Sequence, residues 1–214
     1  MLVTSRSFAE YRAMFDVADG PPDGLVVDCC AGGSSFAAEV AERGGAAIAV
    51  DPVYALGAGA IRRSVTASLG GGNAIIADHG DSFVWDWYGD PANRDRMRAD
   101  AAGRFLADLA RRPSAYLAGA LPHLPLATAS ARLALCSHLL FTWSDRLDAE
   151  WHRAALAELV RVAREVRVFP LVVQGTGAEV PFLGALIDEF HGEVREVPYE
   201  FQRGAHAMLV IRSA

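Results

Sequence analysis

The sequence contains no lysine: all 20 of its basic residues are arginine. This absence excludes several classes of enzyme, because each of them depends on a lysine amine. Phosphate-loop NTPases need it to bind phosphate, and pyridoxal-phosphate enzymes and Schiff-base aldolases need it to form an imine. The reductases with a Tyr-x-x-x-Lys motif need it for proton transfer. The protein therefore belongs to none of these classes.

Cysteine is scarce, and long apolar runs are missing. Three cysteines, two of them adjacent, make neither a disulfide framework nor a zinc site, which predicts a reducing, cytoplasmic location. The six histidines show no metal-ligand spacing, so no metal is expected. Residues 1–16 carry polar side chains throughout and lack the apolar centre of a signal peptide. No run approaches the length of a membrane span, so no membrane partner is expected.

The charge is acidic overall, with a formal net charge of −6. The densest basic group is interleaved with acids, as Arg94, Arg96 and Arg98 alternate with Asp95 and Asp100. Nucleic acid is therefore not an expected partner. The length of 214 residues, with 52% hydrophobic and 21% charged residues, predicts a single globular domain spanning residues 1–214.

The most informative stretch joins two apolar runs that each end in an acid. Residues 25–28 end at Asp28 and pass through a loop of small residues into a helix that ends near Arg43. Residues 46–51 then form a second apolar run that ends at Asp51. In a parallel α/β sheet, a loop of this kind lets the backbone approach a nucleoside, and the second acid binds the ribose hydroxyls. Either Ser34 or Ser35 is positioned to cap the helix.

The remaining pattern predicts an open, mostly parallel sheet with helices on both faces. An amphipathic helix is expected at residues 7–17, and residues 53–112 are mostly helical, with a glycine-rich break at 70–72. Residues 76–112 are interpreted as an inserted helical lid between the second and third strands. The other strands are expected at 115–118, 132–136 and 166–173, the other helices at 148–164 and 182–190, and an antiparallel hairpin at 194–201 and 206–212.

These features together resemble the class I S-adenosylmethionine-dependent methyltransferases. The resemblance rests on the loop Val26-Val27-Asp28-Cys29-Cys30-Ala31-Gly32, on Asp51, on the Leu-Pro segment 121–126, and on the strand edge 134–140. It implies a Rossmann-like sheet of the seven-stranded methyltransferase type, with S-adenosylmethionine as the cofactor and S-adenosylhomocysteine as the product. The cofactor-binding residues that it implies are Asp28, Cys30, Ala31, Gly32, Ser34, Asp51, Pro52, Ala120, Leu121 and Ser137.

This chain departs from the family pattern at three of those positions. Cys30 and Ser34 stand where the family usually has glycine, and both side chains fit only if the backbone keeps φ below zero there. Ala120 stands where an acid often binds the adenine amine. Adenine would then be held by backbone groups and by stacking on Leu121.

His138 ends the fourth predicted strand, where open α/β sheets bind their ligands, and it is the best candidate for a general base. The alternative is a half-buried histidine bonded to a backbone carbonyl. The candidate acceptor-binding residues are aromatic: Tyr11, Trp85, Trp87, Tyr88 and Tyr199. With Asp86, the tryptophans and Tyr88 could form a pocket for a cationic or amine acceptor. They could equally be a small core that holds the lid in place.

The resulting hypothesis is a bacterial enzyme that transfers a methyl group to a small molecule by in-line displacement, which requires mainly positioning and proton removal. One alternative is a module or partner subunit that binds S-adenosylmethionine without catalysis. A nicotinamide-dependent reductase is disfavoured, because the loop lacks Gly-x-Gly-x-x-Gly. Both a monomer and a homodimer remain open.

Overall fold

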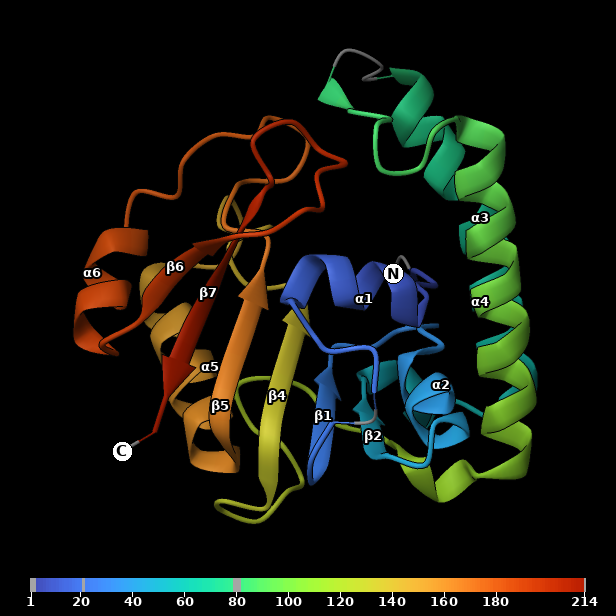
Figure 1. Cartoon of the computed structure of the whole chain (residues 1–214), viewed down its shortest axis with the longest axis horizontal. Helices are drawn as coiled ribbons and strands as arrows, with labels where there is room; N and C mark the ends of the chain where they lie inside the picture. Colours follow the sequence, from blue (N-terminus) through green and yellow to red (C-terminus); the bar gives the residue numbers. More distant parts are fainter. Residues whose placement is uncertain (1–2, 21, 79–81, 214) are drawn as a thin grey trace.

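A computed structural model describes residues 3–20, 22–78 and 82–213, and it shows one mixed sheet with helices on both faces (Figure 1). The strand order is β3-β2-β1-β4-β5-β7-β6. Strands β3, β2, β1, β4 and β5 are parallel to their neighbours, whereas β7 runs antiparallel to both β5 and β6. The predicted fold class is thereby confirmed, including the antiparallel hairpin at the C-terminus.

The elements follow the predicted order. The strands are β1 (Leu25–Cys29), β2 (Ala46–Val50), β3 (Tyr116–Leu117), β4 (Ala131–Ser137), β5 (Ala163–Phe169), β6 (Glu193–Glu196) and β7 (Ala207–Arg212). The α-helices are α1 (Phe8–Phe15), α2 (Phe36–Glu42), α3 (Ala58–Asp78), α4 (Pro91–Arg111), α5 (Ala149–Val162) and α6 (Leu183–Glu189). Short 3₁₀ turns follow β2 and precede β3.

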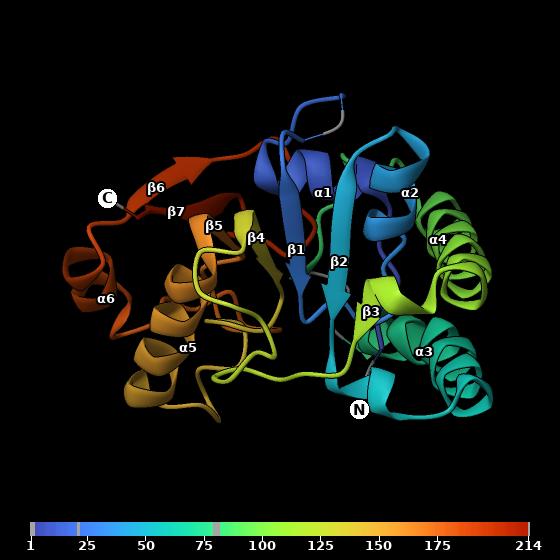
Figure 2. The same cartoon turned by 90° about the horizontal axis from the view of Figure 1, so that it is seen from below.

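Two apolar cores lie on opposite faces of the sheet (Figure 2). Helices α1, α2 and α4 contribute to the first core, through residues such as Phe15, Phe36 and Phe105. Helices α5 and α6 contribute to the second, through Leu156 and Leu186 among others. The central strands are buried on both sides, which is why their sequences are nearly continuous apolar runs.

Three boundaries differ from the predicted ones. The glycine-rich stretch 70–72 does not interrupt the helix, because α3 continues through it to Asp78. Each glycine costs a helix only about 1 kcal/mol relative to alanine, and the packing of α3 along α4 outweighs this cost. Strand β5 begins at Ala163, directly after α5, because pairing with β4 extends that far. It ends at Phe169 because Pro170 has no N–H to continue the ladder.

The third difference shapes the top of the molecule. Strand β6 ends at Glu196, so residues 197–206 form a connection instead of the predicted continuous strand. This connection is bonded to the segment between α3 and α4: the Val84 N–H donates to the Phe201 carbonyl at 2.7 Å and the Arg203 N–H donates to the Ser82 carbonyl at 2.9 Å. Both segments lie beyond the carboxyl ends of the parallel strands (Figure 1). Residues 79–81 of the predicted lid lie outside the described residues.

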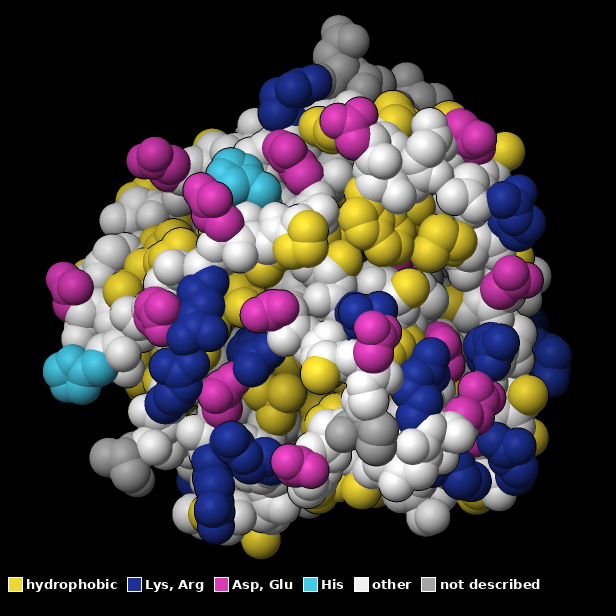
Figure 3. Space-filling model, in the orientation of Figure 1, with side chains coloured by type: hydrophobic (Ala, Val, Ile, Leu, Met, Phe, Trp, Pro, Cys, Tyr) yellow, Lys and Arg dark blue, Asp and Glu magenta, His cyan; other side chains and the backbone are white. Residues whose placement is uncertain are grey.

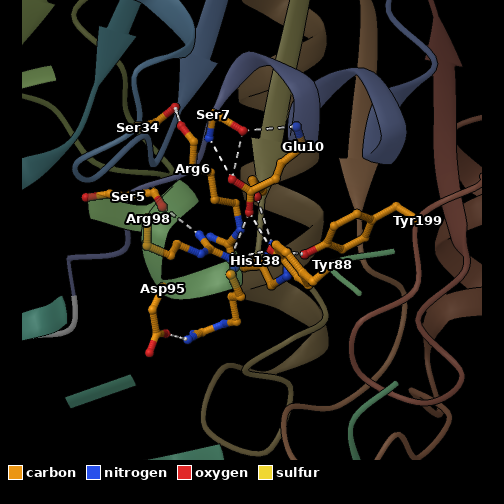
Figure 4. Close-up of polar contacts among 12 residues, drawn as sticks. Ser5, Arg6, Ser7, Glu10, Ser34, Tyr88, Asp95, Arg98, His138 and Tyr199 are labelled. Carbon is orange, nitrogen blue, oxygen red and sulfur yellow. Dashed lines mark hydrogen bonds and ion pairs between the residues drawn. The ribbon is translucent and has the colours of Figure 1, made fainter. Parts of the chain in front are cut away.

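Helix α1 is anchored by a buried carboxylate (Figure 4). Glu10 is fully buried, and the Arg98 guanidinium of α4 lies 2.9 Å from it. The Tyr88 hydroxyl donates to Glu10 Oε1 at 2.6 Å, and the Ser7 N–H donates to Oε2 at 2.7 Å as part of a capping box. Arg98 also donates to the Ser5 carbonyl at 2.7 Å. This group of contacts, here called the Glu10 cluster, joins α1, α4 and the N-terminal segment.

The Glu10 cluster predicts a large loss of stability when one charge is removed. Arg98→Met leaves Glu10 buried without its cation, so the free energy of unfolding should fall by about 3–5 kcal/mol. Arg104→Gln on the same helix breaks the exposed ion pair with Glu42 and should cost about 0–1 kcal/mol. Urea-induced unfolding measures both. Equal losses in the two variants would contradict the importance given to the cluster.

Candidate active site

The register of three parallel strands brings the predicted site residues to one edge of the sheet. Cys29 lies opposite Val50 of β2 and Cys136 of β4. The residues that follow each strand, Cys30, Asp51 and Ser137, therefore emerge at the same carboxyl edge, where open α/β sheets bind ligands.

A cavity of about 560 Å³ lies at this edge and is here called the donor cavity. Ten of the predicted site residues line it: Tyr11, Cys30, Ala31, Gly32, Asp51, Pro52, Ala120, Leu121, Ser137 and His138. Its volume is within the range of small-molecule sites, about 300–1,000 Å³. Two predicted residues, Asp28 and Ser34, do not line the wall and lie behind it.

The loop after β1 has a left-handed backbone at Cys30, a conformation that usually favours glycine. Cys30 has φ +63°, which contradicts the expectation that its Cβ would require a negative φ. Hydrogen bonds from the Cys30 and Ala31 N–H groups to the Val50 carbonyl, at 2.8 and 3.2 Å, hold this conformation. Its cost is about 1–2 kcal/mol for a residue with a Cβ. Ser34 has a negative φ, as expected.

Gly32 requires the absence of a side chain. Its φ is +57°, and a Cβ built there would lie 3.1 Å from the Thr4 carbonyl oxygen. The N-terminal segment therefore packs directly on the loop, and the Gly33 N–H donates to the same Thr4 oxygen at 3.1 Å. The glycine that remains in the loop allows Thr4 to form part of the cavity wall.

Asp51 has two structural contacts that its position in the sequence did not suggest. Its Oδ2 accepts the Gly32 N–H and its Oδ1 accepts the Val53 N–H, both at 2.9 Å. Burial raises the pKa of this carboxyl, and the two backbone bonds oppose that shift. An ionised carboxylate has about four acceptor positions, so these bonds leave capacity for ribose hydroxyls. Asp51 thus fits both as a loop anchor and as a ligand for a nucleoside.

Asp28 is fully buried under the loop, and the Tyr11 side chain lies between it and the donor cavity. The Tyr11 hydroxyl donates to Asp28 Oδ1 at 2.8 Å, while Oδ2 is buried with no hydrogen-bond partner among the described residues. Burial raises the pKa of Asp28 to about 8, against the opposing effect of the Tyr11 bond. Tyr11 itself lines the donor cavity, so it separates Asp28 from the space that a ligand would fill.

His138 lies on the wall that the donor cavity shares with a second cavity. Its φ is +56°, its N–H donates to the Phe169 carbonyl at 2.7 Å, and its Nδ1 lies 2.8 Å from Ser137 Oγ. Burial lowers the pKa of His138 well below the usual value, and the charges of Arg6 and Arg98 lower it further. The imidazole is therefore neutral near pH 7 and able to accept a proton.

The second cavity, of about 390 Å³, lies beside the first and is here called the acceptor cavity. The two share six residues: Val3, Thr4, Arg6, His138, Trp143 and Arg146. Of the predicted aromatic residues, Tyr199 lines the acceptor cavity, but Trp85, Trp87 and Tyr88 line neither cavity.

The aromatic residues that miss the cavities pack as a small core. Tyr88 is bonded to Glu10, Trp87 packs against Tyr199 with ring centroids 5.1 Å apart, and Trp85 packs against Phe201 at 5.3 Å. Asp86 is exposed. The arrangement corresponds to the alternative interpretation, in which these rings hold the insert in place.

The N-terminal segment and Trp143 were not among the predicted site residues. Residues 3–6 precede the first predicted helix and carry no motif, yet they line both cavities. Tertiary contacts bring them there, including their packing on Gly32 and Gly33 and the hydrogen bond from Arg98 to the Ser5 carbonyl. Among the described residues, no group of three or more His, Cys, Asp or Glu is arranged to hold a metal ion. No helix within the described ranges is long and apolar enough to cross a membrane.

No family model matches the chain. An uncharacterized protein of Methanocaldococcus jannaschii is 23% identical, over 99% of this chain and 96% of its own length.

Two solved methyltransferase structures cover most of the chain. Magnesium protoporphyrin IX methyltransferase of Synechocystis, with bound S-adenosylmethionine, is 11% identical over 90% of this chain and 71% of its own, with a TM-score of 0.49. The 1,6-didemethyltoxoflavin-N1-methyltransferase of Burkholderia thailandensis is 15% identical over 89% and 71%, with a TM-score of 0.48. At these values the likenesses carry no argument about function, and the fold assignment rests on the strand order.

The raised pKa of Asp28 predicts a specific dependence of stability on pH. Between the unperturbed value of 3.8 and the folded value of about 8, the folded protein keeps a proton that the unfolded chain releases. The free energy of unfolding of the wild type should therefore decrease as pH rises through this window. Asp28→Asn has no such proton, so its stability relative to the wild type should increase from about pH 5 to about pH 8.

Urea-induced unfolding at several pH values measures this difference. Asp86→Asn, which removes an exposed carboxylate, controls for the change in net charge. A difference between Asp28→Asn and the wild type that stays constant across the window would contradict the raised pKa.

Proposed function

We propose that the protein transfers a methyl group from S-adenosylmethionine to a small-molecule acceptor by in-line displacement. One observation carries this proposal: a nucleoside-type cavity at the carboxyl edge of β1, β2 and β4 shares a wall with a second cavity, and His138 is on that wall. Two adjacent cavities allow a donor and an acceptor to meet, which is the main requirement of a displacement reaction.

In the donor cavity, Asp51 is the residue that we assign to the ribose hydroxyls. Leu121 offers an apolar surface for adenine, beside Ala120 and Pro52. The backbone of Cys30, Ala31 and Gly32 allows close approach of the remaining part of the ligand, because no bulky side chain covers it. Bound S-adenosylmethionine supplies a sulfonium methyl group, and its placement toward the shared wall would direct that methyl to the acceptor cavity.

The insert 76–112 is proposed to act as part of the acceptor wall. Phe83 and Arg94, which belong to the described part of the insert, line the acceptor cavity together with residues of the 197–206 connection. The predicted lid would therefore contact the acceptor through these side chains, while Trp85 and Trp87 hold the insert in position.

His138 is proposed to remove a proton when the acceptor is a hydroxyl or an amine. Its lowered pKa keeps the ring neutral at pH 7, and Ser137 orients the ring through Nδ1. The other ring nitrogen, Nε2, is then the atom that would take the proton. The same arrangement would hydrogen-bond an acceptor that needs no base.

Calorimetry with S-adenosylmethionine, S-adenosylhomocysteine and NADPH tests the donor assignment. Both sulfur nucleosides should bind and NADPH should not. Asp51→Asn removes the charge and one acceptor position, so the affinity for S-adenosylhomocysteine should fall about 10–100-fold. Failure of both sulfur nucleosides to bind the wild type would overturn the proposal. Unchanged affinity in Asp51→Asn would overturn only the assignment of the ribose acid.

His138→Asn tests the base assignment with little change in backbone strain, since asparagine tolerates a positive φ. With an acceptor that the wild type methylates, kcat should fall about 10²–10⁴-fold while the affinity for S-adenosylhomocysteine is retained. A kcat close to that of the wild type would exclude His138 as the base. Tight donor binding without transfer to any acceptor would favour the non-catalytic alternative.

A further inference from the structure

The acceptor cavity has a strongly cationic wall. Four arginines line it, namely Arg6, Arg94, Arg98 and Arg146, and Asp145 is the one acidic side chain among the described residues that line it. The face of the molecule shown in Figure 3 differs, because arginines and acids are interspersed there. The excess of positive charge is therefore a property of the cavity and not of the whole molecule, whose net charge is −6.

Three of these arginines have acidic partners in the protein, and one of them is Arg146, which lies 3.6 Å from Asp145. Arg98 is held by Glu10, Tyr88 and the Ser5 carbonyl, so it shapes the wall. Arg94 lies 2.9 Å from Asp95, and its guanidinium lies over the Phe201 ring at 5.3 Å. Arg94 therefore lies next to an aromatic surface. It is one helical turn before Arg98 on α4, so both side chains are on the same face of that helix.

Arg6 is the one of these four arginines that forms no ion pair with a described carboxylate. Among the described residues, no carboxylate lies within 4.0 Å of its guanidinium, and its Nε is buried without a hydrogen-bond partner. Burial lowers the pKa of Arg6 and the charge of Arg98 lowers it further, whereas the charge of Glu10 opposes this shift in part. A buried cation with no counterion is unfavourable unless a ligand supplies the negative charge. Arg6 reaches both cavities, close to His138 (Figure 4).

Five aromatic side chains also line the acceptor cavity. Phe83 and Phe201 pack with ring centroids 4.8 Å apart, and Trp143, Phe169 and Tyr199 complete the apolar surface. Aromatic walls of this kind bind flat, apolar groups. Arginine guanidinium groups are well matched to carboxylate and phosphate oxygens.

We propose that the acceptor is an anionic small molecule, with a carboxylate or phosphate bound by Arg6 and Arg94 and a flat apolar body held between the aromatic side chains. This rests on the proposed function for the identity of the cavity as the acceptor site. It differs from the cationic or amine acceptor that was one of two interpretations of Trp85, Trp87 and Asp86 in the sequence.

Calorimetry with the full-length protein saturated with S-adenosylhomocysteine tests this proposal. The probes are 4-hydroxybenzoate, phenyl phosphate, the uncharged isostere 4-hydroxybenzamide and the cation 4-hydroxybenzylamine. At least one anionic probe should bind about tenfold more tightly than the amide, and the amine should bind most weakly. The carboxylate and phosphate probes together show which of the two anions is preferred. Equal affinities, a preference for the amine, or no binding of either anion at millimolar concentration would overturn the proposal.

Variants of the cavity arginines test where the anionic group of the probe binds. Arg94→Gln and Arg6→Gln should each weaken the preferred anionic probe about tenfold and leave the amide unchanged. Arg104→Gln, on the exposed side of the same helix as Arg94, should leave every affinity unchanged. Loss of anion preference in Arg104→Gln, or its retention in both Arg94→Gln and Arg6→Gln, would overturn the assignment of the site.

A separate arm distinguishes the acceptor from the amino-acid part of the donor, which also carries a carboxylate. In Arg6→Gln, the affinities for S-adenosylhomocysteine and for 5′-methylthioadenosine, which lacks that part, should change equally if Arg6 binds the acceptor. A selective loss for S-adenosylhomocysteine, with the anionic probe unaffected, would overturn the role given to Arg6. Failure of the donor proposal has a different signature: S-adenosylhomocysteine does not bind, while the anionic probes still discriminate when tested without it.

Discussion

The buried pair between Glu10 and Arg98 is the interaction on which the two cavities depend. Each charge is almost fully buried, so each is tolerable only in the presence of the other. Through Arg98 the pair holds the Ser5 carbonyl, and through Tyr88 it holds Tyr199. Glu10 lies on α1 and Arg98 lies on α4, 88 positions later in the sequence. The N-terminal segment that borders both cavities is therefore held in place by a long-range contact.

Three of the six described non-glycine residues with a positive φ lie at the same edge of the sheet. Cys30, His138 and Phe141 all have positive φ values without being glycine. Such residues persist where the surroundings over-determine the conformation, and they cluster at functional sites. Here the Val50 carbonyl holds Cys30 and the Phe169 carbonyl holds His138, so neighbouring strands impose both conformations. The strain places Cys30 against the donor cavity and His138 on the wall between the cavities.

Much of the fold and of the donor cavity could be predicted from the sequence, because these features depend on local patterns. An apolar run that ends in an acid shows where a buried strand stops, and the parallel register then brings such ends together at one edge. Asp51 was predicted in this way, whereas Gly32, Leu121 and Ser137 were predicted from the resemblance to the methyltransferase family. The helix through Gly70–Gly72 was not, since its packing along α4 is a tertiary contact that overrides the local preference of glycine. The second contact of Asp51, with the Gly32 N–H, was likewise invisible because it joins two loops.

The sequence by itself determined the order of strands and helices and the edge of the sheet at which a nucleoside could bind. Its lack of lysine also excluded the enzyme classes that need a lysine amine. The tertiary structure alone decided the charge of the neighbouring cavity. Along the chain, Arg94 and Arg98 alternate with acids and resemble a solvated surface group. On α4 they lie one turn apart on the inward face, while Arg96 points to solvent. Helical periodicity therefore separates charges that are adjacent in sequence, and packing against α1 and the N-terminal segment turns one set of them into the wall of a site.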